Sequence, residues 1–105
     1  MKINILGAEY TITEQSQTEN TLLTNCDGYC DWTSKEIVVE RDMLGNLKKM
    51  DSYKRKVVRH EIVHAFLLES GLADGSEWAR SEEMVDWLAR QGIALVKAWK
   101  EADVL

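Results

Sequence analysis

His60 and His64 are the only two histidines of the chain, and they stand four residues apart in the run His60-Glu61-Ile62-Val63-His64. If this run is helical, the two imidazoles project from one face and can bind the same cation. At 100° per residue they lie about 40° apart around the helix axis, with Glu61 about 60° beyond His64. Two neutral imidazoles with a carboxylate beside them suit a hydrolytic zinc site. The motif therefore predicts zinc-dependent hydrolysis, with Glu61 next to the metal as the general base.

A long amphipathic helix is expected to carry this motif. Asp51 or Ser52 can cap its start, and Gly71 supplies its end after residues 69–70. Its apolar side follows a spacing of three and four residues and comprises Val58, Ile62, Ala65 and Phe66. One side of the helix should therefore enter a core, while the histidines face a cleft.

A catalytic zinc site needs three protein ligands, and no third histidine exists. A second long helix is expected from Trp78 or Ser81 to about Glu101, and Glu82 and Glu83 stand near its start. Glu82 lies on the apolar stripe that should face the first helix, where a buried carboxylate requires a cation. Glu82 is therefore the predicted third ligand, and Glu83 is the alternative.

Asp86 follows Glu82 by one helical turn. From that position its carboxylate can accept a hydrogen bond from the far side of a ligand histidine and so orient the ring. We therefore expect Asp86 to support the metal site without binding the metal.

The first forty residues predict a small, mostly antiparallel sheet of about four strands. Alternating residues at 2–6 and 10–13 indicate one hairpin, and residues 29–32 and 36–40 indicate a second. Residues 21–23 can begin a further strand. The charged ends of the strand at 36–40 suit a sheet edge, where an extended substrate can also add itself as a strand.

Bulk composition sets the class of protein. A chain of 105 residues with 45% apolar and 30% charged residues is expected to form one domain, residues 1–105. The net charge of −5 argues against a nucleic-acid binder, and no apolar run is long enough for a membrane span. Without a recognisable signal peptide, a cytoplasmic protein with free thiols at Cys26 and Cys30 is expected.

Residues 41–49 are expected to connect the sheet to the first helix.

His60-Glu61-x-x-His64 followed by Glu82-x-x-x-Asp86 resembles the gluzincin metallopeptidases, whose third ligand is the glutamate of a Glu-x-x-x-Asp element on the next helix. The small size is similar to that of the minigluzincins and the ImmA/IrrE-type metallopeptidase domains. The match covers roughly residues 36–90 and implies a zinc-binding α+β domain with peptidase chemistry. Seventeen residues separate His64 from Glu82. The spacing of eighteen to Glu83 is that of the large gluzincin aminopeptidases, so Glu83 stays open.

The leading hypothesis is a zinc metallopeptidase that acts on a protein or peptide. Zinc lowers the pKa of its bound water from ~16 to ~7, and Glu61 takes the proton of that water. Tyr29 and Tyr53 are candidate oxyanion donors only because they are phenols. The alternative is a non-catalytic or latent zinc-stabilised module that regulates or binds a partner protein.

Overall fold

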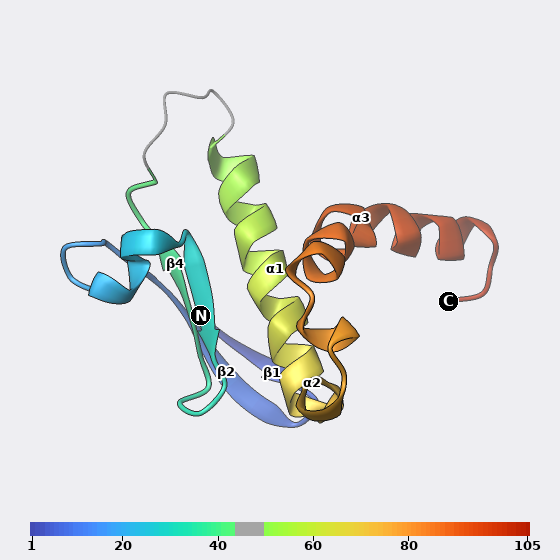
Figure 1. Cartoon of the computed structure of the whole chain (residues 1–105). Helices are drawn as coiled ribbons and strands as arrows, with labels where there is room; N and C mark the ends of the chain where they lie inside the picture. Colours follow the sequence, from blue (N-terminus) through green and yellow to red (C-terminus); the bar gives the residue numbers. More distant parts are fainter. Residues whose placement is uncertain (44–49) are drawn as a thin grey trace.

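One long helix packs against one face of a four-stranded sheet, and a second long helix packs on the first (Figure 1). In this computed structural model, residues 1–43 and 50–105 are described. The sheet packs on α1, and α3 crosses α1 on the side away from the sheet. The α+β class expected from the sequence is confirmed. Part of the expected connector, residues 44–49, lies outside the described residues.

The sheet has the strand order β1-β2-β4-β3. Its strands are β1 (Lys2–Ile5), β2 (Ala8–Gln15), β3 (Gly28–Asp31) and β4 (Glu36–Glu40). The β1–β2 and β3–β4 pairs are the two predicted hairpins, and both are antiparallel. The central β2–β4 pair is parallel, so the sheet is mixed with mostly antiparallel pairing.

The strand suggested at residues 21–23 is wrong, because this segment forms the 3-10 helix η1 (Thr21–Asn25). The Asn20 side chain accepts a hydrogen bond from the backbone N–H of Leu22 at 3.0 Å. Such a local side-chain cap satisfies the backbone within a turn and competes with strand pairing.

The edge position suggested for residues 36–40 is also wrong, because β4 lies between β2 and β3. Ile37, Val38 and Val39 are all buried, so both faces of this strand are covered. Three consecutive apolar residues are typical of an interior strand, and this pattern outweighs the charged ends. Glu40 is buried as well, and its Oε1 accepts a hydrogen bond from the Asp42 N–H at 3.1 Å. The outer strands of the sheet are β1 and β3.

The hydrophobic core lies between the sheet and α1 (Met50–Glu69). Its buried members are Ile5, Tyr10, Ile37, Val39, Val57 and Ala65. At the end of α1, Glu69 accepts a hydrogen bond from the Tyr10 hydroxyl at 2.7 Å and pairs with Lys35. The carboxylate in the last turn of α1 therefore ties the helix to the sheet.

Both predicted long helices are present. Gly71 ends α1 in the left-handed conformation, with φ 83°. The short α2 (Leu72–Gly75) and η2 (Trp78–Arg80) lead to α3 (Glu82–Glu101). Ser81 caps α3, because its side chain accepts from the N–H of Met84. Among the helices that the structure describes, none has the length and apolarity needed to cross a membrane.

Candidate metal centre

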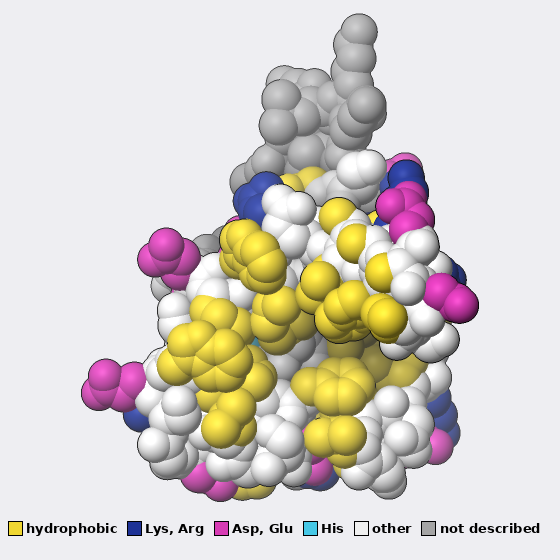
Figure 2. Space-filling view, turned by 90° about the vertical axis from the view of Figure 1, so that its right-hand side faces the viewer, with side chains coloured by type: hydrophobic (Ala, Val, Ile, Leu, Met, Phe, Trp, Pro, Cys, Tyr) yellow, Lys and Arg dark blue, Asp and Glu magenta, His cyan; other side chains and the backbone are white. Residues whose placement is uncertain are grey.

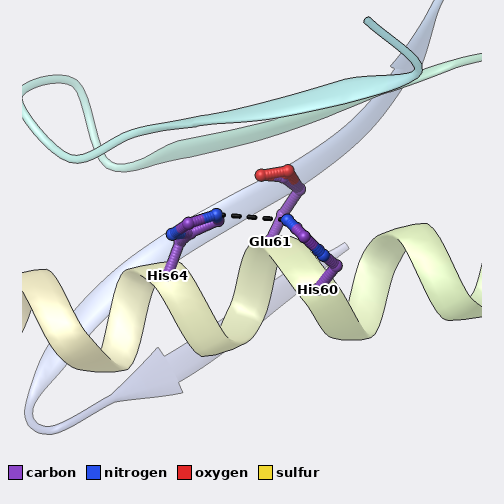
Figure 3. Close-up of side chains that lie close together, drawn as sticks. All are labelled: His60, Glu61 and His64. Atoms are coloured by element: carbon purple, nitrogen blue, oxygen red, sulfur yellow. Dashed lines mark hydrogen bonds between the residues drawn. The ribbon is translucent and has the colours of Figure 1, made fainter. Parts of the chain in front are cut away.

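His60, Glu61 and His64 lie on one side of α1, and their potential ligand atoms are all within 4.8 Å of one another. Figure 3 shows the three side chains rising from the same stretch of helix towards the β3–β4 hairpin. The two imidazole Nε2 atoms are 3.2 Å apart. This group can hold a metal ion.

Glu82, the first residue of α3, reaches both histidines. Its Oε2 lies 2.9 Å from His60 Nε2, and its Oε1 lies 2.9 Å from His64 Nε2. The side chain of the neighbouring Glu83 is exposed and makes no hydrogen bond or ion pair to any residue within the described parts of the chain. The crossing of the two helices therefore brings Glu82, and not Glu83, to the histidine pair.

Asp86 holds the other side of the His60 ring. Its carboxylate accepts from Arg90 Nε at 2.6 Å and from Lys56 Nζ at 3.1 Å, and it lies 3.2 Å from His60 Nδ1. Hydrogen bonds from Arg90 and then Lys56 hold the pKa of Asp86 well below its usual range. An ionised carboxylate can only accept, so the neutral form of His60 that donates from Nδ1 to Asp86 turns its Nε2 lone pair towards Glu82.

The nitrogen and oxygen atoms that meet between the two histidines and Glu82 suit a bound cation. Burial lowers the pKa of His64, which favours its neutral form. The His60 Nε2 lone pair, His64 Nε2 and the Glu82 carboxylate then converge, and three groups rich in lone pairs repel each other unless a cation or a proton lies among them. Two imidazole nitrogens and one carboxylate are a donor set that suits Zn²⁺.

Glu61 differs from the other acidic groups at the site in its burial, since only 6% of the residue is exposed. Burial raises the pKa of Glu61 to about 7, and the nearby Glu82 carboxylate contributes to the rise. In Figure 3 its carboxylate extends past the imidazoles towards the hairpin. A carboxyl with a pKa near neutrality, beside a possible metal site, is suited to accept and return a proton.

A cleft of about 540 Å³ opens over these residues. Residues 26–30 line it on the sheet side, and residues of α1 and the start of α3 line the other side. Both phenols suggested as oxyanion donors line the cleft and each has a hydrogen-bond partner, but only the Tyr53 hydroxyl uses its own hydrogen in that bond. The Tyr29 hydroxyl accepts from Asn20 Nδ2 at 2.8 Å, and the Tyr53 hydroxyl donates to Asp27 Oδ2 at 2.5 Å.

Two features of the site were not predicted from the sequence. Lys56 and Arg90 flank Asp86, and the predicted free thiols of Cys26 and Cys30, free also in the structure, line the cleft. Lys56 lies four residues before His60 and therefore on the same face of the helix. This spacing could have indicated from the sequence that Lys56 lies near the site. The position of the cysteines depends on how the β3 strand approaches α1, which no local pattern specifies.

Comparison of this chain with protein-family models, with curated proteins and with solved structures finds no match. The site geometry is therefore the basis on which a function can be inferred.

Proposed function

We propose that the protein is a zinc-dependent metallopeptidase, with His60, His64 and Glu82 as the metal ligands and Glu61 as the general base. One observation carries the proposal: both imidazole Nε2 atoms face the Glu82 carboxylate at 2.9 Å, beside a buried carboxyl group in an open cleft. A purely structural site closes its coordination shell with four protein ligands, whereas this one offers three and keeps a carboxyl group next to them.

In the proposed reaction each residue of the site has a separate role. A bound zinc ion would supply Lewis acidity towards a carbonyl group and would lower the pKa of a water molecule. Glu61 is placed to take the proton of that water and to return it to the leaving amine. Asp86 keeps the His60 ring in the orientation that presents Nε2 to the site. The cleft between β3 and α1 gives an extended peptide room along an outer strand of the sheet.

Glu61→Gln is the decisive variant, because glutamine keeps the shape of the side chain but cannot act as a base. We expect the variant to bind about one zinc per chain, as the three-ligand site requires, and to lose about 10²–10⁴-fold in peptide hydrolysis. Zinc content is measured by elemental analysis, and hydrolysis by mass spectrometry of a mixed-sequence peptide library with and without chelator. Glu77→Gln is the matched control, because Glu77 is exposed and lies away from the cleft lining.

The competing function is a zinc-stabilised module that binds a partner protein without cleaving it. If the unaltered chain holds zinc but cleaves no peptide of the library, this second function is favoured. If His60→Ala and His64→Ala bind as much zinc as the unaltered chain, the metal site itself is wrong.

A further inference from the structure

A groove opens where α3 extends away from α1. In the first half of α3, Val85 and Ala89 are buried, and Arg59 Nε of α1 donates to the Ala89 carbonyl at 2.7 Å. Further along the same stripe, at helical spacing, Ile93 and Val96 are 64% and 40% exposed. In Figure 1 the second half of α3 extends away from α1 and from the sheet. The groove is therefore closed near Ala89 and open towards the end of α3.

The walls of this groove are aliphatic, and its volume is about 590 Å³. Figure 2 shows hydrophobic side chains gathered around a hollow on the side of the molecule where α3 lies. The apolar lining residues are Ile62 and Val63 of α1 with Leu88, Ala89, Ile93 and Val96 of α3. A volume in this range with mostly apolar walls is typical of a binding site for a small organic molecule.

The shape of the groove limits what can fill it. Its lining on α3 runs from Leu88 to Lys100, which is about 18 Å at 1.5 Å per residue. Spread over that length, 590 Å³ corresponds to a mean cross-section of roughly 33 Å². A helix with its side chains is about 10–12 Å wide, a cross-section of roughly 80–110 Å². The groove is thus too narrow for a whole helix, but it has room for one unbranched hydrocarbon chain.

Gly92 leaves space in the groove. It lies in the middle of α3 and lines the groove, although glycine weakens a helix relative to alanine. A Cβ atom added there would meet no other atom within 4 Å, so no contact inside the described chain requires glycine at this position. A larger side chain would instead occupy the space that a ligand can fill.

Charge defines the ligand further. The basic residues Arg59, Lys97 and Lys100 line the groove, and no acidic residue of the described chain does so, although the net charge is −5. Lys97 and Lys100 are three residues apart, so their side chains are neighbours at the open end of the groove and can contact the same anion. Apolar walls with two cations at the open end complement an unbranched carboxylate.

We infer that the groove binds a free long-chain fatty acid, with its tail between α1 and α3 and its carboxylate between Lys97 and Lys100. The tail lies towards the closed end, where it is removed from water, and the charged head stays hydrated at the open end. This groove and the cleft of the metal centre share no lining residue. The inference is therefore independent of the proposed peptidase activity.

The first test is calorimetric titration of the full chain with dodecanoate below its critical micelle concentration. We expect saturable binding that tightens by up to about fourfold for each methylene group added between octanoate and dodecanoate, the value for a buried CH₂. Gly92→Leu places a side chain in the groove and should raise the dissociation constant at least about tenfold. Ala94→Leu is the matched control, because it adds the same side chain on the exposed opposite face of α3 and should bind like the unaltered chain.

Two results of this titration would overturn the inference. One is a chain that takes up no dodecanoate, including one whose groove binds an acidic amphipathic peptide instead. The other is a Gly92→Leu variant that binds dodecanoate as tightly as the unaltered chain does.

The second test changes the charge of the ligand and of the site. Dodecyltrimethylammonium has the same tail and the opposite charge, and it should bind the unaltered chain at least about tenfold more weakly than dodecanoate. The double variant Lys97→Glu/Lys100→Glu should reverse this preference. Misfolding of the variant would weaken the binding of both ligands and cannot produce a reversal. Equal binding of the two ligands to the unaltered chain, or a double variant that still prefers dodecanoate, means that the fatty-acid site is wrong.

Discussion

At the level of single residues, the candidate metal centre depends on which lone pairs of His60, His64 and Glu82 face one another. Asp86 accepts from two cations and so accepts, rather than donates, at His60 Nδ1. In the neutral ring this leaves His60 Nε2 as an acceptor facing another imidazole and a carboxylate. The arrangement is unfavourable without a positive charge among these atoms and favourable with a divalent cation.

Glu82 and Glu83 provide a matched pair of variants for the third ligand. We expect Glu82→Gln to weaken zinc binding by more than about 100-fold, the upper end of what a supporting residue contributes, because it removes the charge facing both imidazoles. Glu83→Gln makes the same change one residue away and should leave zinc affinity unaltered. Titration against a chromogenic zinc chelator measures both. Equal losses in the two variants would contradict the assignment of Glu82.

Asp86→Asn tests the support of the histidine ring. The amide oxygen can still accept from His60 Nδ1, but the charge that pairs with Lys56 and Arg90 is lost. We expect zinc affinity to fall about 10–100-fold, as is typical when the partner of a ligand histidine is replaced. The same chelator titration applies, with the exposed Asp74→Asn as control. Unchanged affinity in Asp86→Asn would mean that the charge of Asp86 contributes nothing to metal binding.

At the level of elements, β3 and α1 approach each other closely at Gly28. A Cβ atom at this position would lie 2.9 Å from Val57 Cγ1 and 3.0 Å from the Val38 carbonyl oxygen. The cleft beside Glu61 is therefore bounded by a strand that only glycine allows to lie this near the helix.

Gly28→Ala should consequently push β3 away from α1 and reduce the free energy of unfolding by about 1–3 kcal/mol. Gly75→Ala is the control, since an added Cβ there meets nothing within 4 Å. Urea unfolding of both variants measures the difference. In a double-mutant cycle, Val57→Ala should relieve part of the Gly28→Ala cost. If the two costs simply add, the contact with Val57 is not the cause.

The helices could be predicted from the sequence because their determinants are local. Ser81 and Gly71 mark helix ends through their own backbone and side-chain chemistry, and the apolar stripe of α3 by itself predicts that Glu82 faces α1. The strand order could not be predicted in the same way. The parallel pairing of β2 with β4 joins residues about 25 positions apart, and no local pattern encodes it. The close contact of Gly28 with α1 depends on that same non-local arrangement.

At the level of the whole molecule, the core and the candidate metal centre stabilise different parts of the chain. The core joins the sheet to α1, whereas α3 buries only Val85 and Ala89 among its own residues within the described structure. Polar contacts also hold α3 to α1: Asp86 with Lys56 and His60, and Arg59 Nε, which donates to the Ala89 carbonyl at 2.7 Å. A metal bound by His60, His64 and Glu82 would add a direct link between the two helices.

Removal of the metal should therefore loosen α3 and leave the sheet and α1 folded. With free zinc at 100 times its dissociation constant, binding adds about 2.7 kcal/mol to the free energy of unfolding, which for a domain of this size corresponds to a Tm increase of roughly 10–20 °C. Chelation should reverse that increase and accelerate hydrogen exchange in the first half of α3, with little change in β2 and β4. His64→Ala should show neither response to zinc, because it lacks one ligand. A uniform rise in exchange across the chain would instead mean that the metal stabilises the whole fold, and that the core between the sheet and α1 does not hold without it.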